Sequence, residues 1–245
     1  MSSVNDHRHE PSPQAIARTT AVCFLITIVL GVVAEGYISG RLVVLRDPAA
    51  TAANITGNTG LFRLGFMLYL GEMAAQIVMT ALFYQLLKPV HRGVALLSAI
   101  FGFVGCTIKI VARLFYIMPL LVLGAPSNAA GFSGEQLNAL AVLLLNLNDR
   151  GAAVALPFFG FSTLLQGWLI MRSTFLPRWL GVLAILDGAG WLAFLWQPLG
   201  YRLFPFIALL GLIGSVAMIL WLLVRAVDEP RWLEQARVSA GSAWR

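Results

Sequence analysis

Apolar residues along the chain fall into six long runs separated by polar segments. A helix needs about 20 mostly apolar residues to cross a bilayer, and each run is long enough. The pattern predicts an all-α protein, a polytopic bundle of six transmembrane helices. The predicted spans are Ala17–Ser39, Leu61–Leu87, Gly93–Leu123, Gly151–Met171, Trp179–Leu199 and Leu203–Val224. Together they form a single membrane domain, residues 17–224, between polar tails at 1–16 and 225–245.

The distribution of Lys and Arg predicts the orientation of the bundle. With the N-terminus inside, the inner segments carry Arg8, Arg18, Lys88, Arg92, Arg172, Arg178, Arg225, Arg231, Arg237 and Arg245, and the outer segments carry Arg41, Arg46, Arg63, Arg150 and Arg202. Basic residues are enriched in cytoplasmic loops. Ten basic residues in the inner segments against five in the outer segments therefore predict that both termini are cytoplasmic and that the protein lies in the cell's inner (plasma) membrane.

The second long outer loop contains a predicted helix of its own. Ser133 and Gln136 fit a capping box, and the leucines behind them fall on one helical stripe. We interpret Gly134–Asn148 as an amphipathic helix on the outer side. If it continued the fourth span, one helix of about 57 Å would result, so we expect a break near Asn148–Gly151.

Composition narrows the classes of protein. Hydrophobic residues make up 59% of the 245 residues and charged residues only 11%, against about 25% charged in soluble domains. This excludes a disordered chain, a secreted disulfide scaffold and a nucleic-acid-binding domain. The net charge of +6 is explained by loop residues at the cytoplasmic face. Membrane lipids are the expected partners, and no nucleic acid is expected.

Small and polar residues recur at helical spacing within the spans, which marks the faces that pack in the bundle. The fifth span carries the stripe Gly181, Ala184, Asp187 and Trp191, and the sixth carries Ala208, Gly211 and Ser215. Gly211 and Ser215 also form a small-xxx-small pair, which makes a homo-oligomer a candidate assembly. Asp187 lies roughly 12 Å from the inner face. It either pairs with an inner Arg or is protonated.

Charged residues within the spans are the main functional lead, because each costs at least about 2.5–3.5 kcal/mol near mid-membrane. Glu72 and Lys109 lie at similar estimated depths, which predicts an ion pair, and Arg113 lies one turn farther out than Lys109. The candidate ligand-binding residues gather toward the outer half of the bundle. They are Glu35, Arg63, Glu72, Gln76, Lys109, Arg113, Asp149 and Arg150.

Three functions fit these charges. The first is an outward-open pocket that binds or transports a small anionic or amphiphilic ligand, with Gly134–Asn148 as its lid. In the second, the protein is structural or regulatory and the charges are static helix–helix pairs. The third is a lipid-modifying enzyme that uses Asp149 with Arg150 or Glu35. The three histidines lie in the tail and an inner loop, which argues against membrane haem, zinc or Ser-His chemistry. We assign no catalytic residue, metal or cofactor.

Several segments resemble one family of bacterial membrane proteins. They are Gly31–Tyr37, Arg41–Val44, Asp47–Ile55, Leu61–Gly65, Tyr84–Val90, Phe158–Gly160 and Ser173–Gly181. The family is known only as domain of unknown function 4386, and the resemblance covers about Ala15 to Trp232. It implies a six-helix protein of the bacterial inner membrane, and it implies no activity.

Overall fold

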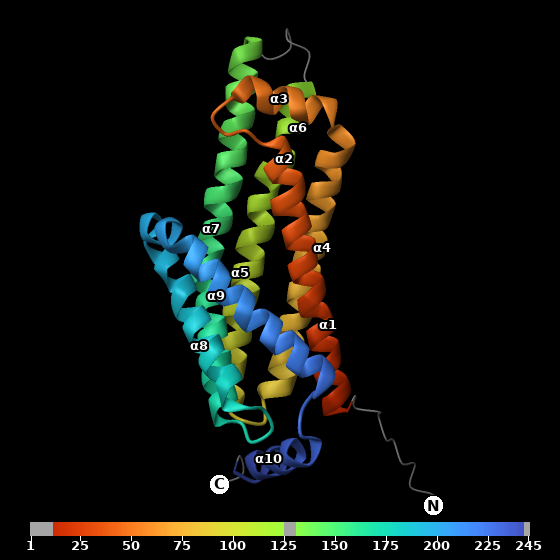
Figure 1. The fold of residues 1–245 in the computed structure, drawn as a ribbon, viewed down its shortest axis with the longest axis vertical. Coiled ribbons are helices and arrows are strands. Elements are labelled where there is room, and N and C mark those ends of the chain that lie inside the picture. Colours follow the sequence, from red (N-terminus) through yellow and green to blue (C-terminus); the bar gives the residue numbers. More distant parts are fainter. Residues whose placement is uncertain (1–11, 125–130, 243–245) are drawn as a thin grey trace, which may run out of the picture.

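The computed structural model describes residues 12–124 and 131–242, which are helical apart from short connections (Figure 1). Six helical segments are long and apolar enough to cross a membrane, which confirms the predicted six-helix bundle. The elements are α1 (Pro13–Gly31), the π-helix η1 (Val32–Ser39), α2 (Gly40–Leu42), α3 (Pro48–Gly57), α4 (Thr59–Leu87), α5 (Arg92–Ile117), α6 (Pro119–Gly124), α7 (Gly134–Arg172), α8 (Arg178–Trp191), the 3₁₀ helix η2 (Leu192–Leu195), α9 (Gln197–Val224) and α10 (Glu229–Ser242).

The bundle has two distinct ends (Figure 1). At the tail end, α1 begins and α9 stops, and α10 lies across the ends of the other helices. The indole N–H of Trp232 on α10 donates to the carbonyl oxygen of Leu86 at 2.9 Å, which satisfies a carbonyl at the end of α4. At the opposite end, the cap end, α3 and α6 pack against the first part of α7.

Local sequence explains where the helices start. Ser12 caps α1 by accepting from the amide of Ala15, and the predicted capping box of Ser133 and Gln136 at the start of α7 is confirmed. Pro119 separates α5 from α6. The fifth predicted span extended to Leu199, but α9 already begins at Gln197, because a proline in its first turn favours initiation there.

The expected break near Asn148–Gly151 is wrong, because α7 runs unbroken over 39 residues. The side chain of Asn148 is buried, and its Oδ1 atom accepts a hydrogen bond from Arg113 on α5. It therefore does not form a hydrogen bond with backbone groups of its own helix that would interrupt the helix. A Cβ on Gly151 would lie only 3.1 Å from the Cβ of Ala112, so the two helices touch closely there. Gly134–Asn148 is therefore the cap-end part of a spanning helix about 58 Å long, packed on α3 and α6.

Helices α7 and α8 approach each other through glycines spaced seven residues apart on both. Gly167 and Gly181 face each other, since a Cβ on either would lie 2.8 Å from the carbonyl oxygen of the other. Gly160 and Gly188 repeat the contact nearer the cap end, where a Cβ on Gly188 would lie 2.6 Å from the amide nitrogen of Leu164. Without side chains in the way, the backbones come into direct contact. This contact fixes which face of α8 is turned toward α7.

A side chain at Gly188 is expected to separate α7 from α8. We expect Gly188→Ala to lower the free energy of unfolding in detergent micelles by about 1–3 kcal/mol, the usual range for overpacking. Gly60→Ala on α4 is the matched control, because nothing lies within 4 Å of the added Cβ. Equal unfolding free energies for the two variants would contradict the close glycine contact.

Candidate functional site

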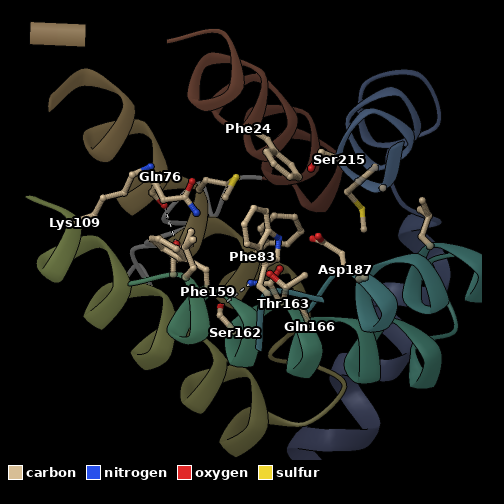
Figure 2. A pocket seen from close by; sticks show the side chains of 18 of the residues that line it. Phe24, Gln76, Phe83, Lys109, Phe159, Ser162, Thr163, Gln166, Asp187 and Ser215 are labelled. Carbon is tan, nitrogen blue, oxygen red and sulfur yellow. Dashed lines mark hydrogen bonds between the residues drawn. The ribbon is translucent and has the colours of Figure 1, made fainter. Parts of the chain in front are cut away.

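A cavity of about 270 Å³ lies inside the bundle between all six spanning helices (Figure 2). It reaches from Lys109 on α5 toward Leu180, near the start of α8 and so near the tail end. Its lining residues are Phe24, Met73, Gln76, Met79, Thr80, Phe83, Lys109, Leu156, Phe159, Ser162, Thr163, Gln166, Leu180, Ala184, Asp187, Trp191, Gly214, Ser215 and Met218. A concave, mostly apolar space with a few polar groups is the usual form of a small-molecule site.

The walls of the cavity are aromatic and thioether side chains, and its charged groups lie on opposite sides. Figure 2 shows Lys109 beside Gln76 on one side and Asp187 on the other, with Phe83 and Phe159 between them. On one wall, the side-chain amide of Gln166 donates to the Ser162 hydroxyl at 3.2 Å. The cavity thus has an apolar middle and two polar ends.

The predicted ion pair between Glu72 and Lys109 is confirmed. Lys109 Nζ donates to Glu72 Oε1 at 2.6 Å, and the two side chains are only 18% and 8% exposed. Gly31 on α1 makes room for the carboxylate, since a Cβ there would lie 3.3 Å from Glu72 Cδ. Lys109 lines the cavity, whereas Glu72 is buried beside it, and its Oε2 atom has no hydrogen-bond partner among the residues that the structure describes. The ammonium group therefore faces the cavity with its charge already balanced.

Asp187 lines the cavity without a charged partner among residues 12–124 and 131–242. Its Oδ1 atom is buried and accepts no hydrogen bond in that part of the chain. Gly211 on α9 lies against this oxygen, because a Cβ there would be 2.8 Å away. The indole N–H of Trp191 lies within hydrogen-bonding reach of the carboxylate, and Oδ1 is the oxygen left without a partner among the described residues. None of the described inner Arg residues forms an ion pair with it. Asp187 was outside the predicted site, although its stripe of small residues marked this face.

Arg113 is also a buried charged residue, with only 3% of its surface exposed, and it lies outside the cavity. Its guanidinium carbon lies 3.5 Å from the centre of the Tyr69 ring, a cation–π contact, and Nη1 donates to Asn148 Oδ1 at 3.0 Å. Its Nε atom has no hydrogen-bond partner among the described residues. Asn148 also donates to Asp149 at 2.8 Å, so the amide links the cation to an acidic group.

A hydrogen-bonded group at the cap end surrounds Arg113. The hydroxyl of Tyr69 donates to Glu35 Oε2 at 2.5 Å and lies 3.0 Å from the Ser39 hydroxyl, which in turn donates to Tyr116 at 3.4 Å. Glu35 and Ser39 belong to η1, and π-helical turns often occur at functional sites. We call Glu35, Ser39, Tyr69, Arg113, Tyr116, Asn148 and Asp149 the cap cluster.

The eight predicted site residues thus separate into groups. Lys109 and Gln76 line the cavity, and Glu72 pairs with Lys109. Glu35, Arg113 and Asp149 belong to the cap cluster, whereas Arg63 and Arg150 are exposed, the latter stacked 4.8 Å above the Tyr201 ring. The cavity itself extends toward the tail end, away from the predicted outer position. Its apolar lining carried no signal that distinguishes it from ordinary core.

The small-xxx-small pair on α9 is engaged within the chain. Gly211 packs against Asp187, and Ser215 lines the cavity. These two residues are therefore not free to form a helix–helix contact with a second copy. A homo-oligomer therefore stays a prediction, and this pair of residues no longer supplies its contact surface.

The sequence model of one family, Domain of unknown function (DUF4386), matches residues 19–226. The chain belongs to the DUF4386 family. No curated protein and no solved structure matches the chain. The cavity and the cap cluster both lie within the part of the chain that this DUF4386 match covers.

The Glu72–Lys109 pair of this DUF4386 protein is expected to be strongly coupled. Glu72→Gln alone leaves the Lys109 ammonium without a counter-ion, and the loss in unfolding free energy should be about 3–5 kcal/mol. The double variant Glu72→Gln with Lys109→Met removes both charges and should lie closer to the wild type. Unfolding of the singles and the double in detergent micelles gives the coupling. Additive losses would contradict a direct pair.

Proposed function

We propose that this DUF4386 protein binds a small amphiphilic molecule inside its transmembrane bundle. The observation that carries the proposal is the cavity of about 270 Å³, whose apolar lining includes the Asp187 carboxylate, which has no ion-pair partner within residues 12–124 and 131–242. Its volume lies just below the range of about 300–1,000 Å³ for drug-sized sites, which favours a compact ligand.

The cavity supports binding better than a purely structural role. Side chains that only hold helices together are expected to be paired, as Ser98 and Ser162 are: each hydroxyl donates to the other's carbonyl oxygen at 2.9 Å. The Glu72–Lys109 contact also fits a static pair. Asp187 does not fit this pattern, because a buried carboxylate is costly unless it is paired and fully hydrogen-bonded, and its Oδ1 atom has no partner among the described residues. The static interpretation therefore accounts for Glu72 and Lys109 and leaves Asp187 unexplained.

We further propose that the tail end faces the cytoplasm of a bacterial cell and that the protein lies in the plasma membrane. The support is the excess of Lys and Arg in the sequence segments predicted for the inner side, ten against five in the outer segments. Four of them, Lys88, Arg92, Arg172 and Arg178, lie on or beside the two tight links between spans. The cap cluster would then lie toward the outer side.

Reporter fusions test this orientation. Green fluorescent protein fused after Arg245 is expected to fluoresce, and alkaline phosphatase fused there is expected to be inactive, because only the former matures in the cytoplasm. The same reporters fused after Asn58, between α3 and α4, should give the opposite readings. A reversed pattern at both sites would mean that the tail end faces outward.

Filling the cavity tests ligand binding. Ala184 lines the cavity, so Ala184→Phe is expected to abolish binding of the neutral probe 2-phenylethanol. Ala189→Phe on the same helix is the matched control, because Ala189 is exposed on the outer surface of α8. Binding is measured by equilibrium dialysis of the radiolabelled probe against protein in lipid nanodiscs, with empty nanodiscs as background. Wild-type binding no greater than that of Ala184→Phe would contradict the proposal.

A further inference from the structure

We infer that the ligand is a small hydrophobic amine, bound with its ammonium group at Asp187. This inference rests on the proposed function, since it names the chemical class of molecule that the cavity takes. It differs from the anionic ligand expected from the sequence. The difference follows from which of the embedded charges are already paired.

The charge balance of the cavity is negative. Among the described residues that line the cavity, Lys109 is the only cation, and Glu72 neutralises it at 2.6 Å. Arg113, the buried cation with spare donor capacity, is not part of the lining. Asp187 is the remaining charged group of the lining, and no ion pair within residues 12–124 and 131–242 includes it. An anion would therefore meet an unbalanced carboxylate, whereas a cation would balance it.

The position of the carboxylate suits a bound cation. Figure 2 shows Asp187 directed into the cavity toward Phe83 and Thr163. Its Oδ1 atom is buried with no hydrogen-bond partner in the described part of the chain, so an N–H donor of a ligand would find free acceptor capacity there. The hydroxyls of Thr163 and Ser215 also line this space and can accept further N–H bonds.

The walls favour an organic cation over a metal ion. Phe24, Phe83, Phe159 and Trp191 contribute aromatic rings to the lining, and the faces of such rings attract ammonium groups through cation–π interactions. Metal ions need several oxygen, nitrogen or sulfur ligands. Within the described residues, no group of three His, Cys, Asp or Glu side chains is placed to hold one. One carboxylate in an aromatic and thioether cavity is thus suited to an amine with an apolar body.

The two ends of the cavity also set the orientation of the ligand. Asp187 lies roughly 14 Å along α8 from its start at the tail end, and Lys109 lies roughly 26 Å along α5. Lys109 at the far end is already paired with Glu72, whereas the Asp187 carboxylate at the end nearer the tails has no ion-pair partner among the described residues, so the amine is held at the Asp187 end. The apolar body then extends along Phe83 and Phe159 toward Gln76 (Figure 2).

Three probes that differ in their polar group test the inference: 2-phenylethylamine, 2-phenylethanol and phenylacetate. Their dissociation constants are measured by equilibrium dialysis against the full chain in nanodiscs of phosphatidylcholine. The wild type is expected to bind the amine about 10- to 100-fold more tightly than the alcohol, the range for a hydrogen bond to a charged group. Phenylacetate should bind most weakly. Asp187→Asn should remove the preference for the amine and leave the affinity for the alcohol unchanged.

The alcohol serves as the internal control, because unchanged affinity shows that the Asp187→Asn protein is folded with its cavity intact. Asp228→Asn is the matched charge control. It removes the same charge from the tail-end surface, where Asp228 pairs with Arg231 at 3.2 Å, and it should keep the preference for the amine. One result would overturn the inference and leave the proposed function standing: the wild type binds the alcohol and the amine equally well, and Ala184→Phe abolishes binding of the alcohol. Binding of none of the three probes would overturn both.

Discussion

A charge removed from water must be balanced inside the bundle, and this constraint organises the structure. Helices satisfy their own backbone groups, so side-chain charges are the largest remaining cost in an apolar surrounding. Glu72 and Lys109 meet the constraint by direct contact. Arg113 meets it through the Tyr69 ring and the Asn148 amide, which spread the cost over neutral partners. Asp187 does not meet it within the described chain, and this carboxylate gives the cavity a chemical preference.

The close contact of α7 with α8 is what presents Asp187 to the cavity. Glycines at seven-residue spacing let the two backbones touch, and a helix held at this distance has little freedom to rotate. The face of α8 that carries Ala184, Asp187 and Trp191 is thereby turned toward the other spans. Gly211 on α9 completes the arrangement, because any larger residue would displace the carboxylate. The glycines that pack these helices thus also determine where the Asp187 carboxylate lies in the cavity.

The embedded polar groups belong to two layers with different characters. The cap cluster is hydrogen-bonded from Glu35 through Tyr69 and Ser39, and none of its residues lines the cavity. The cavity layer nearer the tail end combines bonded side chains, such as Lys109 and Ser162, with open space between the helices. Arg113 lies one helical turn from Lys109, so the two layers are joined through α5.

Much of this protein followed from its sequence alone. Hydrophobic run length determined the number of spans, because the thickness of the bilayer sets the length of a helix. Equal depth along two adjacent spans predicted the Glu72–Lys109 pair, since depth depends only on residue counting. The capping box at Ser133 is local in the same way. Each of these features depends on residues near one another in the chain or on one shared length scale.

Only the tertiary structure decided which charges are left unpaired and where the open space lies. Rotation of a helix about its axis depends on its neighbours, so Asp187 could not be assigned to a cavity from its own helix. The continuity of α7 through Asn148 likewise depended on Arg113, a residue 35 positions away that takes up the polar side chain. A ligand site inside a bundle is a gap between surfaces from six segments. Local sequence encodes the surfaces, and only their packing creates the gap.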